Sequence, residues 1–147
     1  FKVIGVDILI KLENKKKIKK HFLSKNIKLI ETSSTDIKTF SKLKKITSGK
    51  KTLVVLDSNH SHKHVLEEIK LFSKLIKKNG YIVVQDTTTE FVKKKHINKN
   101  RDFGKGNNPF TAVNTFLKTN NKFKIDKYYE NKSFITGCFN GFLKKVI

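Results

Sequence analysis

The sequence predicts an α/β domain with a mostly parallel sheet. Short apolar runs alternate with segments whose apolar residues recur at helical spacing, a pattern typical of parallel strands covered by helices. The chain has 147 residues, of which 37% are hydrophobic and 31% charged. That length suits one compact core and is too short for two. Collagen-like, mucin-like and wholly disordered proteins are therefore excluded.

The first 50 residues predict two strands and two helices. Strands are expected at residues 3–7 and 27–30, where apolar runs end at polar residues. A lysine-rich helix is expected between them, with three apolar residues at helical spacing: Ile18, Phe22 and Leu23. A second, amphipathic helix repeats apolar residues between Ile37 and Ile46, and Gly49 follows its end.

The middle of the chain predicts two further strands around a long helix. Residues 53–56 form the most apolar strand and residues 81–84 another. Ser61 is placed to cap the helix between them, which continues to Ile76. Residues 87–107 are polar and without periodicity, and a loop of that length in a compact domain is usually functional, often a lid.

The C-terminal part predicts a helix and then antiparallel strands. Asn108 is expected to cap the helix, with Pro109 in its first turn. Three strand-like segments follow, at residues 123–129, 134–138 and 142–146. Asn140 and Gly141 join the last two, and Asn-Gly is a strong hairpin signal. We therefore expect the sheet to end in an antiparallel hairpin.

The charge balance has two interpretations. Lysine and arginine number 33 against 12 acids, giving +21, a value that suggests nucleic acid or an anionic membrane. However, Arg101 is the only arginine and Ala112 the only alanine, as AT-rich codon usage would produce. Proteins that read nucleic acid favour arginine. We favour a solvated lysine surface over a nucleic-acid partner, and a basic nucleic-acid-binding module stays the alternative.

Cysteine content and the chain start bear on compartment and completeness. Cys138 stands alone, which excludes an internal disulfide and a CxxC zinc site and indicates a reducing, cytoplasmic setting. No apolar run approaches the roughly 20 residues of a membrane span, and no signal peptide is visible. Phe1 leads directly into a strand, so we expect a further segment upstream.

Polar residues follow each predicted parallel strand. These residues are Asp7, the cluster 31–36, Asp57, and the pair Gln85 and Asp86. Ligands of open parallel sheets bind outside the carboxyl ends of the strands, so we expect these side chains at one edge. An acid at the position of Asp7 can bind both hydroxyls of a ribose. The alternative is that Asp7 caps the helix that follows.

The residues after the apolar strand 53–56 suggest a metal site with a base. Asp57 and Asp86 could share a hard divalent cation such as Mg²⁺. His60 lies three residues after Asp57, within reach of a substrate hydroxyl as general base. The alternatives are a helix-capping role for Asp57 and a surface histidine at 60. The run HSHKH is weak support for a zinc site.

A family resemblance covers nearly the whole chain. The segment LVVLDSNHSHKHVLEEIKLFSKLIKKNGYIVVQDT, residues 53–87, resembles the central block of the cephalosporin hydroxylase and rhamnosyl O-methyltransferase family. Further matching segments are VIGVDI, IKLIETSSTD, GKGNNPFTAVNTFL and FKIDKYYENKSFITGCFNGFLKKV. The resemblance implies a Rossmann-like, S-adenosylmethionine (SAM) dependent methyltransferase fold. Residues 1–147 would form one partial domain that lacks the first strand and its glycine-rich SAM loop.

The resemblance also assigns the cofactor side of the site. Asp7 matches the acid that binds the ribose of SAM, and Ser33 and Ser34 belong to the segment near the adenine. Asp57 matches an aspartate between the methionine moiety and Mg²⁺. The absent strand would lie between the strands that end in Asp7 and Asp57, leaving unpaired edges. We therefore expect this chain alone to bind SAM poorly.

The resemblance completes the metal site with Gln85 and Asp86. The family normally has glutamate at the position of Gln85, so the amide keeps an oxygen ligand but removes a charge. His60 stands where the similar catechol O-methyltransferases have a lysine base. The resulting hypothesis is a Mg²⁺-assisted, SAM-dependent O-methyltransferase acting on a hydroxyl of a small molecule or sugar.

Other functions stay open beside this hypothesis. Gln85 could mark a catalytically weakened homologue. A hydroxylase, as one family name suggests, fits badly because no two-histidine, one-carboxylate iron triad is evident. The oligomeric state is not predicted.

Overall fold

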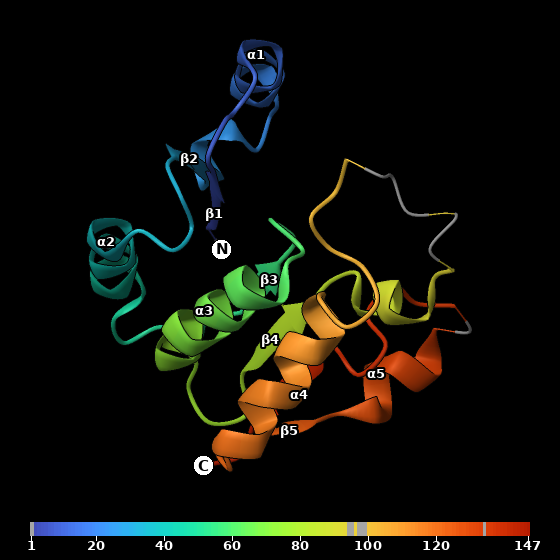
Figure 1. Cartoon of the computed structure of the whole chain (residues 1–147). Coiled ribbons are helices and arrows are strands. Elements are labelled where there is room, and N and C mark those ends of the chain that lie inside the picture. The colour runs from blue at the N-terminus through green and yellow to red at the C-terminus, as the bar shows by residue number, and fades with distance from the viewer. Residues whose placement is uncertain (1, 94–95, 97–99, 134) are drawn as a thin grey trace. The chain divides into compact units, whose positions relative to one another are not determined.

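The computed structural model describes all residues except 1, 94–95, 97–99 and 134. The chain divides into two compact units, Phe1–Leu43 and Lys44–Ile147 (Figure 1). A single domain over residues 1–147 stays a prediction. None of the helices in the described residues has the length and apolar composition that a membrane span requires.

The first unit is a small parallel pair with a helical crossover. Strand β1 (Val3–Asp7) pairs in parallel with β2 (Ile27–Glu31), with Asp7 opposite Glu31. Helix α1 (Leu12–Lys20) and a short 3-10 helix, η1 (Ser24–Asn26), connect them. Both strands lie where the sequence predicts them, whereas α1 ends before the predicted apolar positions 22 and 23 because the backbone becomes extended at residue 21.

Helix α2 (Ile37–Thr47) contains the boundary between the two units. It begins after Asp36, whose carboxylate accepts a hydrogen bond from the Thr39 amide at 2.6 Å. Gly49 follows its end with a φ of 76°, a left-handed conformation that favours glycine. The predicted amphipathic helix is therefore confirmed, together with its stop.

The second unit contains a four-stranded mixed sheet. Its strand order is β3 (Val54–Leu56), β4 (Tyr81–Val84), β6 (Phe142–Lys145) and β5 (Phe123–Ile125). β3 and β4 are parallel, whereas β6 is antiparallel to both of its neighbours. In the described part of the chain, β1 and β3 each pair with one strand only. Parallel pairing that changes to antiparallel at the C-terminus confirms the prediction.

The predicted C-terminal hairpin is wrong in its partners. β5 ends at Ile125, and Asp126 then caps helix α5 (Lys127–Lys132) by accepting a hydrogen bond from the Tyr128 amide at 3.0 Å. Residues 135–138 form no strand, and residue 134 lies outside the described residues. The antiparallel partner of β6 along the chain is therefore β5, across an intervening helix.

The Asn-Gly pair makes a turn into β6 instead of a hairpin. Asn140 has a φ of 58°, and the Gly141 amide donates to the Cys138 carbonyl at 2.7 Å. The Gly141 carbonyl accepts from the Val84 amide at 2.9 Å. A Cβ at position 141 would lie 2.2 Å from the Val84 carbonyl oxygen, so this close approach to β4 requires glycine.

Two helices pack together in the second unit. α3 (His62–Phe72) continues into a 3-10 turn, η2 (Ser73–Leu75), and lies beside α4 (Pro109–Thr119) (Figure 1). Asn108 caps α4 as predicted, in a reciprocal capping box with Thr111. Ser61 occupies the N-cap position of α3, but its side chain makes no capping hydrogen bond. The predicted loop 87–107 begins with a short helix, η3 (Thr87–Phe91).

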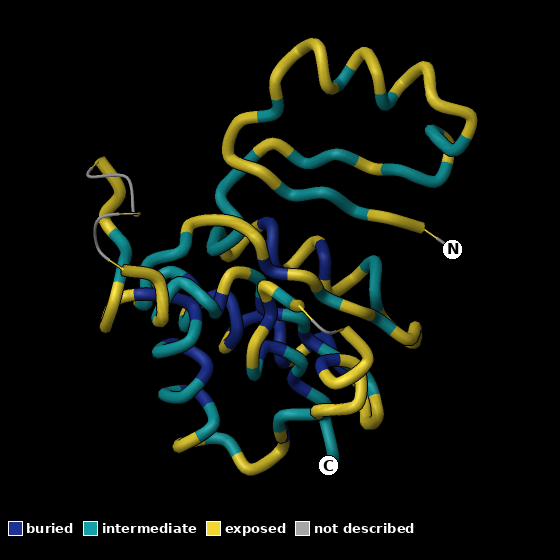
Figure 2. Tube along the Cα trace, turned by 90° about the vertical axis from the view of Figure 1, so that its right-hand side faces the viewer, coloured by how far each residue is buried: buried dark blue, intermediate teal, exposed yellow. Residues whose placement is uncertain are grey.

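The core of this unit lies among α3, α4 and the central strands. Figure 2 shows the buried stretches of this unit in dark blue. The most deeply buried apolar side chains are Ile69, Ile82, Val84, Val113, Phe116 and Leu143. This packing supports the ends of β3 and β4, where the polar residues emerge.

Candidate functional site

The site is built on two adjacent parallel strands. Leu56 of β3 lies opposite Val84 of β4, and the Gln85 amide donates to the Leu56 carbonyl at 2.9 Å. Asp57 and Asp86 therefore emerge at the same edge of the sheet. Asp86 adopts a left-handed conformation with a φ of 53°, which turns the chain sharply into η3.

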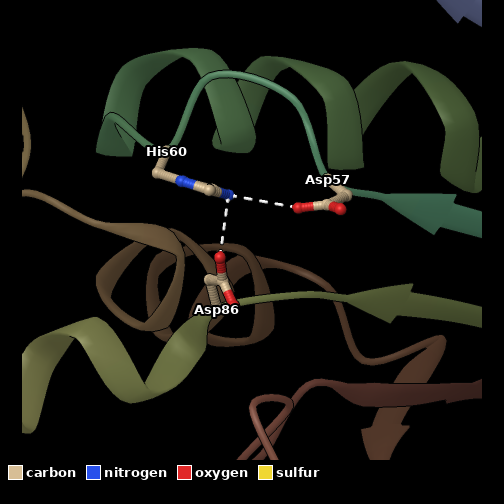
Figure 3. A group of neighbouring side chains, drawn as sticks. All are labelled: Asp57, His60 and Asp86. Atoms are coloured by element: carbon tan, nitrogen blue, oxygen red, sulfur yellow. Dashed lines mark hydrogen bonds and ion pairs between the residues drawn. The ribbon is translucent and has the colours of Figure 1, made fainter.

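Three side chains converge at this edge. His60 Nε2 lies 3.4 Å from Asp57 Oδ1 and 3.4 Å from Asp86 Oδ2, and Figure 3 shows the imidazole pointing at both carboxylates. The three ligand atoms all lie within 4.8 Å of one another. The His60 side chain is 15% exposed, against 60% for Asp57 and 51% for Asp86. The carboxylates therefore face solvent while the imidazole is largely enclosed.

An aromatic contact orients the imidazole. The Phe103 ring meets the His60 ring edge to face, with centroids 5.1 Å apart and an interplanar angle of 89°. Phe103 belongs to the segment between η3 and α4, and the Arg101 guanidinium lies 5.5 Å from its ring centroid. The predicted loop 87–107 thus contributes a wall to the site.

The geometry of the cluster suits a divalent cation. Two carboxylates and one imidazole are ordinary ligands for such an ion. Ligand atoms about 2.1 Å from a shared ion lie roughly 3 Å apart when adjacent and about 4.2 Å apart when opposite. The carboxylate oxygens of Asp57 and Asp86 lie within 4.8 Å of each other, so small side-chain shifts would let both bind one ion and leave His60 Nε2 free beside them.

Gln85 lies apart from this cluster. Its side-chain oxygen accepts a hydrogen bond from the Cys138 thiol, with an O–S distance of 3.4 Å. The group that the structure assembles within the described residues contains Asp57, His60 and Asp86. A metal-binding role for Gln85 stays a prediction.

The negative charge of the site affects the pKa of Cys138. Burial raises the pKa of its thiol, and the nearby carboxylates of Asp86 and Asp57 raise it further. The thiol therefore stays protonated at neutral pH and acts as a hydrogen-bond donor to Gln85. This raised pKa also argues against a reactive cysteine.

Three of the four predicted cofactor residues, Asp7, Ser33 and Ser34, lie in the first unit, and the fourth, Asp57, lies in the second. Asp7 ends β1, its carboxylate accepts from the Leu9 amide at 3.1 Å, and α1 begins only at residue 12. Asp7 is therefore not the helix cap offered as its alternative. Ser33 Oγ lies 3.0 Å from Thr35 Oγ1, and Ser34 follows in the same turn after β2. Asp7 and this turn share the carboxyl end of the two-stranded sheet.

The alternative roles considered for Asp57, His60 and the HSHKH run also do not fit the structure. Asp57 does not cap α3, because Ser61 occupies the N-cap position. His60 is too enclosed for an ordinary surface histidine. His62 Nδ1 lies 2.7 Å from Thr111 Oγ1, so the HSHKH run distributes its side chains in different directions. A zinc site in that run has no support from the described residues.

Sequence reasoning missed an acid that fastens the loop beside the site. The Glu90 carboxylate accepts hydrogen bonds from the Gly106 amide at 2.8 Å and from the Asn108 side chain. The bond from Gly106 is the main reason that the pKa of Glu90 is lowered. The Asn107 side chain accepts from the His62 amide at 2.8 Å. The glycine- and asparagine-rich run 104–108 was the available signal for this tight turn.

A pocket of about 650 Å³ opens beside η3. Its lining residues are Thr88, Phe91, Glu130, Asn131, Ser133, Ile135, Thr136 and Phe139. Thr88 is two residues after Asp86, and its amide lies 3.5 Å from the Gly137 carbonyl. A Cβ at Gly137 would lie 3.4 Å from Asp86 Oδ1, so segment 136–138 borders both the pocket and the cluster.

Comparison with known sequences finds one family. Residues 1–146 match the family described as Rhamnosyl O-methyltransferase/CmcI. Curated relatives include the rhamnosyl O-methyltransferases of Mycobacterium bovis (strain BCG / Pasteur 1173P2) and Mycobacterium tuberculosis (strain ATCC 25618 / H37Rv), each 34% identical over 123 residues. The match covers 80% of this chain and 46% of each relative, so the chain spans less than half of their length.

Comparison with solved structures identifies the fold. The MycE methyltransferase from the mycinamycin biosynthetic pathway, in complex with Mg and SAH, superposes with a TM-score of 0.56 at 14% identity. Its complex with Mg, SAH and mycinamycin VI gives a TM-score of 0.53 at 13% identity. Each match covers 99% of this chain and 36% of the other. The predicted methyltransferase fold is confirmed.

Proposed function

Because this chain belongs to the rhamnosyl O-methyltransferase/CmcI family, we propose that it carries the metal and base residues of a SAM-dependent O-methyltransferase. The observation that carries this proposal is the convergence of His60 Nε2 on Asp57 and Asp86 at 3.4 Å each. A base beside two carboxylates, at the carboxyl ends of parallel strands, is what metal-assisted deprotonation of a hydroxyl requires.

The two carboxylates would hold the cation. Asp57 and Asp86 present exposed oxygens to the same space, and Mg²⁺ prefers a few such ligands with water and substrate oxygens filling the rest. Gln85 is proposed as a further oxygen ligand, which its bond to Cys138 opposes in this structure. When bound, the cation lowers the pKa of a hydroxyl that it contacts, and SAM supplies an electrophilic methyl group.

His60 would take the proton from the acceptor hydroxyl. Its Nε2 faces the cluster, and Phe103 restricts rotation of the ring. Holding the base and the metal ligands in one rigid arrangement reduces the entropic part of the barrier.

Asp7, Ser33 and Ser34 would bind the nucleoside of SAM. Asp7 stands at the end of β1 and the two serines follow β2, as expected for a ribose acid and an adenine-side turn. Asp57 would lie between the methionine moiety of SAM and the cation. These assignments rest on the family resemblance and on strand-end position.

The acceptor would be a sugar or another small hydroxylated molecule. The pocket beside η3 combines the aromatic faces of Phe91 and Phe139 with hydroxyl and amide groups at Thr88, Asn131 and Ser133. Such a mixture suits a ring with apolar faces and polar edges. The named relatives support this class, since they are rhamnosyl O-methyltransferases and since one MycE structure contains mycinamycin VI.

The cluster favours this chemistry over a hydroxylase. It contains one histidine and two carboxylates, whereas a non-haem iron oxygenase uses two histidines and one carboxylate. We also propose a reducing, cytoplasmic setting, because Cys138 is a free and buried thiol.

Alanine substitution of the metal acids tests the proposed function. Asp57→Ala and Asp86→Ala should each abolish methyl transfer by the full-length protein to a rhamnoside acceptor, while thermal unfolding shows both variants folded. If the aspartates had a purely structural role, each substitution would instead lower the free energy of unfolding by about 1 kcal/mol and leave methyl transfer unchanged. Asp102→Ala, at an exposed acid outside the cluster, is the matched control and should keep wild-type transfer.

A further inference from the structure

α3 contains a buried carboxylate that the proposed chemistry does not use. Glu68 is 1% exposed. Its Oε1 accepts a hydrogen bond from Ser58 Oγ at 2.7 Å and lies 3.5 Å from His64 Nε2. Its Oε2 is buried and has no hydrogen-bond partner among the residues that the structure describes.

This arrangement is expensive for stability alone. Burying a carboxylate with one oxygen unpaired costs free energy, and an apolar residue of similar size would extend the apolar face of α3. Glu68 follows the exposed Glu67 and precedes the fully buried Ile69, so it occupies a core position on the helix. The position of its hydrogen-bond partner offers an explanation.

Ser58 stands inside the loop that carries two of the three site residues. It follows Asp57 directly and precedes His60 by two residues. Two further side-chain contacts in this stretch are local: the Ser61 amide donates to the Asn59 side chain at 2.8 Å, and His60 Nε2 lies 3.4 Å from Asp57 Oδ1. The Ser61 side chain makes no capping bond. The Ser58–Glu68 bond therefore ties the loop to the helix core.

We infer that Glu68 is a positioning residue: through Ser58 it fixes the loop 57–60 and so holds Asp57 and His60 at the separation that metal binding and proton transfer need. This inference rests on the proposed function. Functional groups must be held within about 0.5 Å of their productive positions by supporting hydrogen bonds. The solvent-facing Asp57 has 60% of its side chain exposed, so packing alone does not fix it.

Ser58→Ala is the sharpest test because it removes the donor on an exposed residue and replaces no buried side chain. In the full-length protein with no other ligand present, Ser58→Ala should weaken Mn²⁺ binding about tenfold. It should also lower kcat about tenfold. Both effects lie in the range typical for groups that orient metal ligands. The KM for SAM should stay at the wild-type value. Electron paramagnetic resonance measures free Mn²⁺ during the titration, and transfer assays give kcat and KM.

Glu68→Gln supplies the rescue. Its amide oxygen can still accept from Ser58 Oγ, so Mn²⁺ affinity and kcat should stay within about twofold of wild type. Glu67→Gln, at the exposed neighbouring position on α3, is the matched control and should match wild type. The double variant Ser58→Ala with Glu68→Ala should bind Mn²⁺ no more weakly than Ser58→Ala, because both substitutions break the same Ser58–Glu68 hydrogen bond.

The outcomes separate this inference from the proposed function. Wild-type Mn²⁺ affinity and kcat in folded Ser58→Ala overturn the inference, even if its melting temperature falls. A loss in Glu68→Gln as large as that in Ser58→Ala also overturns it. If the wild-type protein neither binds Mn²⁺ nor transfers a methyl group, the proposed function fails instead.

Discussion

At the residue scale, the enclosed imidazole of His60 has two carboxylates within 3.4 Å. The imidazole is placed to take a proton from an acceptor hydroxyl, so its loss should remove base catalysis. His60→Gln should lower kcat by about 10²- to 10⁴-fold without unfolding the protein. Steady-state methyl-transfer kinetics check this, with the exposed His21→Gln as control. Wild-type kcat in His60→Gln would contradict the role.

A second residue-scale prediction concerns pH. The Tyr81 hydroxyl donates to Asp126 Oδ2 at 2.6 Å, and this bond raises the pKa of Tyr81 to about 12. A raised folded pKa gives stability that is present below pH 10, the ordinary value, and lost as pH rises towards 12. Tyr81→Phe should therefore remove this alkaline loss from a plot of melting temperature against pH.

The same bond acts in the opposite direction on Asp126. Hydrogen bonds, first from Tyr81 and then from the Tyr128 amide, lower the pKa of Asp126 below its ordinary 3.8. This stability is present above pH 3.8 and lost as pH falls through the lower folded value. Asp126→Asn should flatten the acid side of the same plot, and an unchanged acid limb would contradict the assignment.

Most of the cluster could be predicted at this scale, but the side-chain partner of Gln85 could not. Asp57, His60 and Asp86 converge because two parallel strands end at one edge, which periodicity reveals. Gln85 stands at the same strand end, yet its orientation depends on Cys138, 53 residues away in sequence. Such a long-range contact leaves no periodic signal in the sequence.

At the element scale, the cap of α4 is the best-defined local structure. Asn108 is fully buried, accepts from the Thr111 amide at 3.2 Å and donates to the Gly104 carbonyl at 2.7 Å. Asn108→Ala should lower the free energy of unfolding by about 2 kcal/mol, because the cap and a buried hydrogen bond are lost together. Denaturant unfolding measures this. Asn114→Ala, inside the same helix, is the control, and an equal effect in both would contradict the capping account.

Local signals predicted the start of α4 and only part of the C-terminal strands. Asn108 and Pro109 are a start signal that acts within a few residues, so tertiary contacts were not needed to recognise it. Residues 123–129 read as one strand because Tyr128 and Tyr129 are strand formers, whereas the cap at Asp126 starts α5. Gly141 serves its contact with β4, which the sequence does not show.

At the scale of the whole molecule, the charge of +21 has a structural component. Lys15 pairs with Glu31, Lys127 Nζ lies 2.5 Å from Glu130 Oε1, and Lys145 Nζ donates to the Ile76 carbonyl at 2.8 Å. These lysines stabilise the fold locally.

The central claim is that this chain supplies the metal and base residues of a SAM-dependent methyltransferase. Isothermal titration of SAM into the full-length protein, with and without Mg²⁺, tests it most directly. We expect saturable SAM binding. We also expect methyl transfer to a hydroxyl acceptor to depend on Mg²⁺. No SAM binding in either condition, with nucleic-acid binding that falls steeply with salt, would contradict the account.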